Sequence, residues 1–332
     1  MNQLIKSRMN KKKKENRNQN LKSFPYGLLV TALFAAMLLF PKAVFNGATE
    51  GLLLWYQVVF PTLFPFMVIT GLLLSTGGLH LITRVIGGPF RRMFRVSENG
   101  AFAVLAGFLC GYPMGAKVTA DLIRSGRISL QEGRYLLSFC NNTSPVFILN
   151  FLVWKTFGEE KLSLPSLVIL TAAPVLISLF TRKYYLQGAP CFRDTSPASQ
   201  AGSGEHFNFQ TFDSSMMNSF EGIVKVGGYI ILFSVLIALL DELPGESPLL
   251  LAAAPTLEVT NGILLIRQNI SCTAAAWCAA LGLTAFGGFC SAAQTQCMIQ
   301  GTGLSIFPYI IQKLAAAGAA SLLALLYIMI FF

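Results

Sequence analysis

The sequence predicts an all-α polytopic membrane protein, and three observations support this: the composition, the distribution of charges and the length of the apolar runs. Of 332 residues, 54% are apolar and 12% are charged, and the mean hydropathy is +0.59, whereas soluble domains are about 25% charged. Stretches without any Asp, Glu, Lys or Arg occur at 51–83, 135–154, 162–181, 226–240, 268–312 and 314–332. Most of them reach the roughly 20 residues that cross a bilayer as a helix. A soluble enzyme, a secreted disulfide scaffold and a dedicated nucleic-acid-binding protein are therefore excluded.

A basic tail precedes the first apolar run. Eight of the 25 Lys and Arg residues lie in it, which predicts a disordered cytoplasmic tail at 1–23 by the positive-inside rule. Binding of nucleic acid or anionic lipid by the lysines at 11–14 is the less favoured interpretation. The first helix, at 24–45, is expected to remain uncleaved because no small-residue cleavage site follows it.

Residues 24–332 are predicted to form one transmembrane domain with two similar halves. After the first helix come a first repeat at 51–185, a polar connector at 186–218 and a second repeat at 219–332. In the first repeat, Pro61 and Pro65 predict a kinked helix. The stretch 80–99 predicts an amphipathic helix on the cytoplasmic surface, broken at its Gly-Gly-Pro sequence.

Two segments are interrupted at their centres by Gly-rich sequences. Segment 100–126 is broken at 111–115, which leaves arms of about 12 residues, or about 18 Å of helix, too short to span. Segment 271–303 is broken at 287–296. Both are predicted to be re-entrant helical hairpins. Aligning Gly111 with Gly288 also aligns Ala116 with Ala293 and Gly126 with Gly303.

The order of elements, span, short segment, broken hairpin, span, occurs twice and favours an inverted repeat. Such repeats, with broken helices that meet near the midplane, are typical of secondary transporters. In the alternative, the stretch 247–267 spans the membrane fully and both hairpins lie on one face. The sequence leaves this alternative open.

Polar residues inside the apolar run 135–154 predict a substrate site. Its centre holds five polar or helix-breaking residues, which must face protein or a water-filled cavity. Helix amino ends and Gly-rich turns suit anions, so this segment, the first break and Lys117 would together hold a small carboxylate. The predicted substrate-binding residues are Tyr112, Pro113, Met114, Gly115, Lys117, Asn141, Asn142, Thr143, Ser144, Ser291, Gln294 and Gln296.

Charges within membrane helices cost about 2.5–3.5 kcal/mol, so they are functional candidates. The charges in or beside the apolar segments are Lys117, Asp121, Arg124, Lys225, Glu258 and Lys313. Lys117 and Asp121 are four residues apart, so a structural ion pair is an equally open interpretation. Glu258 either couples transport to a cation or proton, or lies at the outer interface. The predicted ion-coupling candidates are Asp121, Glu258, Thr260 and Asn261.

No enzyme is predicted. The two histidines, His80 and His206, are far apart, and no nucleophile with a base, phosphate loop or metal cluster can be assembled. The seven cysteines lack CxxC spacing and a nearby histidine, which argues against a disulfide framework and a zinc site. We predict neither a cofactor nor a metal.

Three separated motifs resemble those of one family. The motifs FLCGYPMGAK at 108–117, CNNTSP at 140–145 and LEVTNG at 257–262 are similar to motifs of the YlbJ (SpoVV) family of sporulation integral membrane proteins. The likeness runs from about residue 24 to the end. It implies a fold resembling the core of concentrative nucleoside transporters. It also implies transport of dipicolinic acid from the mother cell towards the forespore, across the outer forespore membrane.

The expected partners are therefore the lipid bilayer and a small anionic substrate, dipicolinate, but no nucleic acid. The dianion's carboxylates would meet Lys117 and amide donors, and its ring would stack on Tyr112 or Phe289. A nucleoside or another small metabolite is the alternative substrate, and a non-transporting scaffold for sporulation is the alternative function. The side of the C-terminus and the formation of a homo-oligomer are open.

Overall fold

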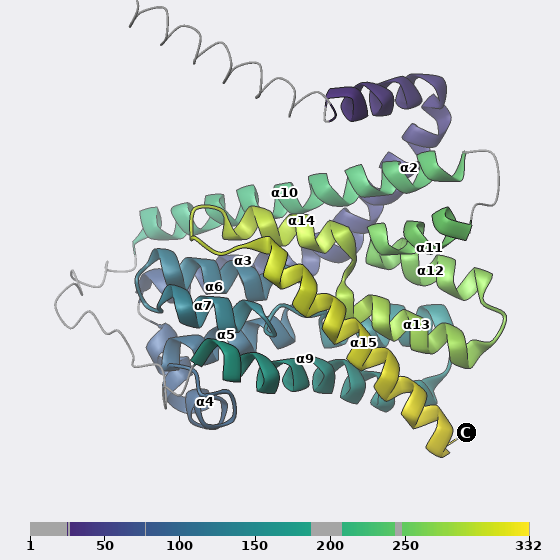
Figure 1. Ribbon diagram of the computed structural model, residues 1–332. Coiled ribbons are helices and arrows are strands. Elements are labelled where there is room, and N and C mark those ends of the chain that lie inside the picture. The colour runs from purple at the N-terminus through teal and green to yellow at the C-terminus, as the bar shows by residue number, and fades with distance from the viewer. Residues whose placement is uncertain (1–24, 26, 77, 187–207, 243–247, 332) are drawn as a thin grey trace, which may run out of the picture.

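The computed structural model describes residues 25, 27–76, 78–186, 208–242 and 248–331 (Figure 1). Every regular element in these ranges is a helix. The helical stretches long and apolar enough to cross a membrane are Pro41–Thr76, Glu160–Leu186, Phe209–Asp241, Thr273–Ile299 and Ile306–Phe331. The predicted all-α membrane class is therefore confirmed. The predicted tail at 1–23 and residues 187–207 of the predicted connector lie outside the described residues.

A helix at Gly27–Leu39 precedes the main body. The α-helices that follow are α2 (Pro41–Leu54), α3 (Phe60–Thr76), α4 (Leu79–Phe94), α5 (Glu98–Leu109), α6 (Met114–Arg124), α7 (Leu130–Leu137), α8 (Pro145–Phe147), α9 (Ser163–Leu186), α10 (Phe209–Asp241), α11 (Pro248–Leu257), α12 (Val259–Asn269), α13 (Thr273–Phe286), α14 (Gly288–Ile299) and α15 (Ile306–Phe331). The π-helical segments are η1 (Trp55–Val59) and η2 (Ile148–Phe157), and η3 (Glu160–Leu162) is a 3₁₀ turn.

Pro61, Pro65 and Pro89 lie inside helices and do not end them. The chain stays helical from α2 through η1 to α3, and η1 ends directly before Phe60-Pro61. A π-helical turn absorbs the backbone bond that a proline removes, so the predicted kink takes the form of η1. Pro89 likewise lies inside α4, and the break expected at its Gly-Gly-Pro sequence is absent.

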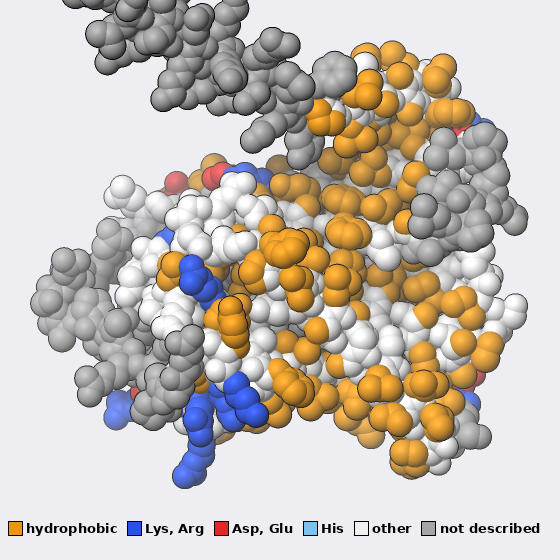
Figure 2. Space-filling model, viewed as in Figure 1, with side chains coloured by type: hydrophobic (Ala, Val, Ile, Leu, Met, Phe, Trp, Pro, Cys, Tyr) orange, Lys and Arg blue, Asp and Glu red, His pale blue; other side chains and the backbone are white. Residues whose placement is uncertain are grey.

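Basic residues gather at one end of the molecule, which we call the basic end. It comprises α4, the α6–α7 turn and the end of α9, with Arg91, Arg92, Arg95, Arg124, Arg127, Arg134, Arg182 and Lys183. Figure 2 shows Lys and Arg side chains over α4 at this end and hydrophobic side chains across the helices beyond it. Large apolar residues such as Leu164, Phe180 and Leu322 are exposed on α9 and α15, as lipid-facing helix surfaces require.

The chain turns back between α5 and α6, as the first hairpin prediction requires. Both arms start or end at the basic end, and their turn points into the molecule (Figure 1). The turn is closed by Gly111, whose φ of 90° is a conformation that glycine adopts without strain. Hairpin 1 is our name for α5, this turn and α6.

The run 135–154 is a broken helix. Helix α7 ends at Leu137, and α8 starts at Pro145 after a non-helical stretch at 138–144. The Ser144 hydroxyl caps α8 by accepting a bond from the Phe147 backbone N–H at 3.2 Å. The unwound stretch lies in the interior of the fold, beside the turn of hairpin 1.

The second half also contains a hairpin and a broken helix, but at positions that differ from those that the alignment of Gly111 with Gly288 predicts. Helices α11 and α12 pack against each other and meet at Glu258, which makes 248–269 the second hairpin, hairpin 2. Helices α13 and α14 do not fold back on each other. They form a second broken helix, interrupted at Gly287 with φ of 87° (Figure 1).

The prediction of a hairpin at 271–303 is therefore wrong, and so is the alternative that 247–267 crosses as one helix. The glycine pair at 287–288 makes a break without a reversal. A chain reversal needs its two helices to pack closely. Gly262 allows this in hairpin 2, because a Cβ there would collide with the Pro255 carbonyl oxygen. Hairpins 1 and 2 enter from opposite ends of the molecule, and their turns point toward each other (Figure 1).

Two glycines of hairpin 1 clamp the first broken helix. A Cβ on Gly107 or on Gly115 would collide with the carbonyl oxygen of Cys140, and on Gly115 it would also come within 2.9 Å of the Asn141 Cα. The absence of side chains at both positions lets the unwound backbone pass between the arms. Hairpin 1 thereby sets the position of the break.

Gly107→Ala should destabilise the protein because the new methyl group meets backbone, which cannot move aside as a side chain can. We expect the free energy of unfolding to fall by about 1–3 kcal/mol. Gly318→Ala is the matched control, since a Cβ there has no neighbour within 4 Å. Thermal unfolding of the purified variants in detergent checks this, and equal midpoints for the two would contradict the clamp.

Candidate functional site

Asn141 connects the first broken helix to both halves of the molecule. Its buried amide nitrogen donates to the hydroxyls of Thr295 and Tyr309, each at 2.9 Å, and its Oδ1 accepts the Ala116 N–H at 3.3 Å. These bonds tie α6, α14 and α15 together. The side chain that the sequence placed among the substrate ligands thus has protein partners for both of its polar atoms.

Lys313 of α15 is buried at the same place. Its Nζ donates to the Asn141 carbonyl at 3.1 Å and to the Asn142 Oδ1 at 3.4 Å, and it lies 4.9 Å from the centre of the Tyr112 ring. The side chain is 3% exposed. Sequence reasoning counted this lysine among the membrane charges but gave it no role. The available signal was its isolation, because no other charge occurs between 268 and 332.

The two broken helices are joined through hydroxyl groups. The Tyr112 hydroxyl donates to the Ala285 carbonyl at 3.1 Å, and the Thr143 hydroxyl donates to the Thr284 carbonyl at 3.0 Å. Both acceptors are among the last carbonyls of α13, which have no partner within their own helix. Hairpin 1 and the first broken helix thus supply hydrogen-bond donors to the backbone carbonyls that lose their helical partners at the second break.

Glu258 caps hairpin 2 from inside the protein. Its carboxylate accepts the backbone N–H groups of Thr260 at 3.0 Å and Asn261 at 2.9 Å, at the amino end of α12. The helix dipole and these two bonds stabilise a negative charge there. The residue is 4% exposed and lines a cavity, so it is not a solvent-facing residue at the end of a helix.

A cavity of about 400 Å³ lies between the turns of the two hairpins. We call it the tip cavity, and it is bounded by η1, α3, α8, η2, α10 and α14. Its volume is in the range of about 300–1,000 Å³ typical of small-molecule sites. The predicted site residues that line it are Tyr112, Thr143, Ser144, Glu258, Thr260, Ser291 and Gln294. Lining residues that the sequence analysis missed include Gln57, Asn150 and Lys155.

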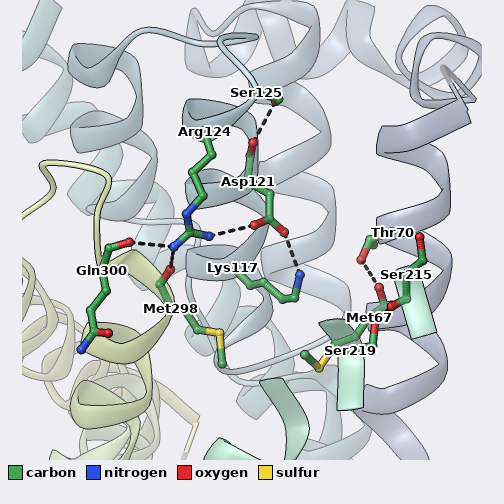
Figure 3. Close-up of polar contacts among 10 residues, drawn as sticks. All are labelled: Met67, Thr70, Lys117, Asp121, Arg124, Ser125, Ser215, Ser219, Met298 and Gln300. Carbon is green, nitrogen blue, oxygen red and sulfur yellow. Dashed lines mark hydrogen bonds and ion pairs between the residues drawn. The ribbon is translucent and has the colours of Figure 1, made fainter. Parts of the chain in front are cut away.

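A second cavity, of about 950 Å³, lies between α3, α6, α10 and α14, on the side of the basic end. We call it the charged cavity, because Lys117, Asp121, Arg124, Glu221 and Lys225 line it. The Asp121 carboxylate accepts from Lys117 at 2.7 Å and from Arg124 at 2.9 Å (Figure 3). The ion pair of Lys117 with Asp121 is thus present, and Arg124 shares the same carboxylate.

Arg124 also caps the carboxyl end of α14. Its second guanidinium nitrogen donates to the carbonyls of Met298 at 2.7 Å and Gln300 at 2.8 Å (Figure 3). A cation at a helix carboxyl end is favoured by the helix dipole. The α6 end of hairpin 1 is thereby fixed to the second broken helix.

The single site predicted from the sequence is divided in the structure. Lys117 and Asp121 line the charged cavity, whereas Tyr112, Thr143 and Ser144 line the tip cavity. Other predicted residues lie outside both cavities. Pro113, Met114, Gly115 and Asn141 are buried in the packing, Asn142 lies beside Lys313, Asn261 is half-buried, and Gln296 is exposed on α14.

Two methionines lie near the region where the linings of the two cavities adjoin. Along α14, Gln294 lines the tip cavity and Met298, one turn later, lines the charged cavity. Along α10, Val226 lines the tip cavity and Gly222, one turn earlier, lines the charged cavity. A Cβ on Gly222 would come within 2.5 Å of the Met67 methyl and 4.0 Å of the Met298 methyl. Met67, fully buried on α3, and Met298 therefore both lie beside Gly222, and we call this pair of side chains the methionine barrier.

The comparisons with known proteins agree with the motifs. Residues 57–159, from η1 to the region after η2, match a family model described as Gate, nucleoside recognition. The chain is 27% identical over 339 residues to the sporulation integral membrane protein YlbJ of Bacillus subtilis (strain 168), covering 90% of this chain and 82% of that protein. The expected resemblance is confirmed. No solved structure matches the chain significantly.

Met67→Ala should connect the two cavities because it removes one side of the methionine barrier. We expect proteoliposomes that contain this variant to leak a small labelled solute faster than those with the unchanged protein. Met93→Ala is the control, since Met93 is 51% exposed on α4. A leak equal to that of the control, from a variant with an unchanged thermal midpoint, would show that the barrier lies elsewhere.

Proposed function

We propose that the protein is a membrane transporter of a small organic anion that works by alternating access between the tip cavity and the charged cavity. The observation that carries this proposal is the pair of cavities on either side of the methionine barrier. Methionine side chains are flexible and unbranched, so the two side chains beside Gly222 can move without breaking polar bonds. Integral membrane character and helical class agree with such a role.

The proposed architecture is an inverted repeat with two re-entrant hairpins. One unit consists of hairpin 1, the broken helix α7–α8–η2 and α9, and the other of hairpin 2, the broken helix α13–α14 and α15. The entry of the hairpins from opposite ends supports this (Figure 1). Secondary transporters commonly place the substrate where such units meet. The positive-inside rule would put the basic end and the N-terminus in the cytoplasm.

Dipicolinate is the substrate that we propose. It is a planar dianion, and the tip cavity offers the Tyr112 ring for stacking, with Gln294 and Lys155 as donors. The charged cavity holds three basic and two acidic side chains, a surplus that attracts anions. The name of the relative, a sporulation integral membrane protein, supports a role in sporulation, and the direction that we propose is from the mother cell towards the forespore across the outer forespore membrane.

A nucleoside is the second candidate substrate, and two observations favour it. The matching family model is described as nucleoside recognition. The Glu258 carboxylate, which lines the tip cavity, would repel a dianion but would accept bonds from sugar hydroxyls. The positive charge of Lys155 should matter for binding of the dipicolinate anion but not for binding of an uncharged nucleoside.

Uptake of labelled dipicolinate into proteoliposomes, with labelled uridine in parallel, tests the proposal. Lys155→Ala should raise the half-saturating dipicolinate concentration about 3- to 10-fold, which corresponds to about 0.7–1.4 kcal/mol, and leave uridine unaffected. Lys161→Ala is the control, because Lys161 is equally basic and exposed but lies outside the cavity.

Gln294→Ala should lower the uptake of whichever substrate is carried, and Gln296→Ala, on the exposed side of α14, should not. Saturable uridine uptake without dipicolinate uptake would replace the anion by a nucleoside. If the folded protein takes up neither solute with either gradient direction, transport is contradicted and a scaffold role is favoured.

A further inference from the structure

We propose that Lys313 is a built-in cation: its ammonium fills a monovalent-cation site formed by the first broken helix, so that the protein binds no metal cation there. This inference rests on the proposed function for its role in transport, but the site itself can be tested without transport. It adds a residue, Lys313, that the substrate proposal does not use, at a site whose ligands share only Tyr112 with the lining of the tip cavity.

The ligands of the ammonium are those that a bound Na⁺ or K⁺ would have. They are the backbone carbonyl of Asn141, at 3.1 Å, the amide oxygen of Asn142, at 3.4 Å, and the face of the Tyr112 ring. Unwound carbonyls of broken helices coordinate coupling cations in secondary transporters, and aromatic faces attract cations. Here all of these groups converge on a side-chain cation.

In the part of the chain that the structure describes, no carboxylate forms an ion pair with Lys313. A buried lysine at membrane depth is costly and cannot extend to the interface when its side chain is 3% exposed. The oxygen ligands and the ring therefore provide its stabilisation, as they would for a free ion.

The surrounding space is large enough for one small ion once the lysine is shortened. A cavity of about 10 Å³ adjoins the ammonium and is lined by Tyr112, Asn142, Thr143, Thr284 and Lys313. About 10–15 Å³ accommodates one water molecule, and truncation of Lys313 adds the volume of its own stem. The site would then take a monovalent cation of the size of Na⁺.

The built-in cation also bears on the class of substrate. Tyr112 lines both the tip cavity and the small cavity, so the Lys313 charge lies directly behind the ring that faces the substrate. In surroundings of low dielectric constant, a fixed positive charge attracts an anion strongly. The tip cavity thereby gains a preference for anions that needs no bound metal and offsets the negative charge of Glu258.

The test measures thermal unfolding in detergent, with Na⁺, K⁺, Li⁺ or choline as the chloride salt at one ionic strength. The unchanged protein should have the same midpoint in all four. Lys313→Ala should unfold about 5 °C or more lower in choline and recover saturably with Na⁺ or another of the small cations. Lys313→Met, which fills the space without charge, should be lowered in every salt.

Lys313→Ser serves as a second truncation, because its hydroxyl adds an oxygen ligand, and it should recover in the same way. Equal midpoints for both truncations in all four salts would overturn the proposal, and so would a Na⁺-dependent midpoint of the unchanged protein. The measurement on the unchanged protein needs no variant, so it still tests the proposal if the truncated variants do not fold. Failure of dipicolinate uptake would contradict the proposed function and leave this result untouched.

Discussion

Backbone that leaves a helix at membrane depth has no water to bond, so the protein itself must pair it. Both broken helices meet this demand with partners far away in the sequence. Lys313 binds the Asn141 carbonyl, and the hydroxyls of Tyr112 and Thr143 bind carbonyls at the carboxyl end of α13. The hairpins, the two breaks and α15 consequently form one connected polar centre, and every other feature of the site is placed relative to it.

The polar centre lies beside a contact of a different kind. The side chains of Met67 and Met298 lie beside Gly222 and pack through apolar contacts, whereas the centre is held by hydrogen bonds to buried groups. Separating two methionines costs dispersion energy and apolar burial, but leaves no donor or acceptor unpaired. The structure thus combines a rigid centre with a soft barrier between two cavities. In the proposed transport cycle, this combination would let a solute pass without loss of the fold.

Much of this arrangement could be predicted from the sequence, because length and polarity are local properties. The apolar runs predicted the helical class, and the short arms around Gly111 predicted hairpin 1. The polar residues at 140–145 predicted the first broken helix. The second hairpin was misplaced because glycines at 287–288 fit a turn or a break equally well, while Glu258 marks a turn without glycine. The role of Lys313 was missed because its ligands lie more than 170 residues away along the chain.

The most direct test of the central claim, that the two hairpins enter from opposite faces of the membrane, is labelling of single cysteines by a membrane-impermeant maleimide in oriented vesicles. Met93 and Ser125 flank hairpin 1, and Asp241 and Ser271 flank hairpin 2; all four are exposed. In a chain whose own cysteines are replaced, the account predicts that cysteines at the first two positions react from one side and those at the last two from the other. Reaction of positions 241 and 271 from opposite sides, or of all four from one side, would contradict it.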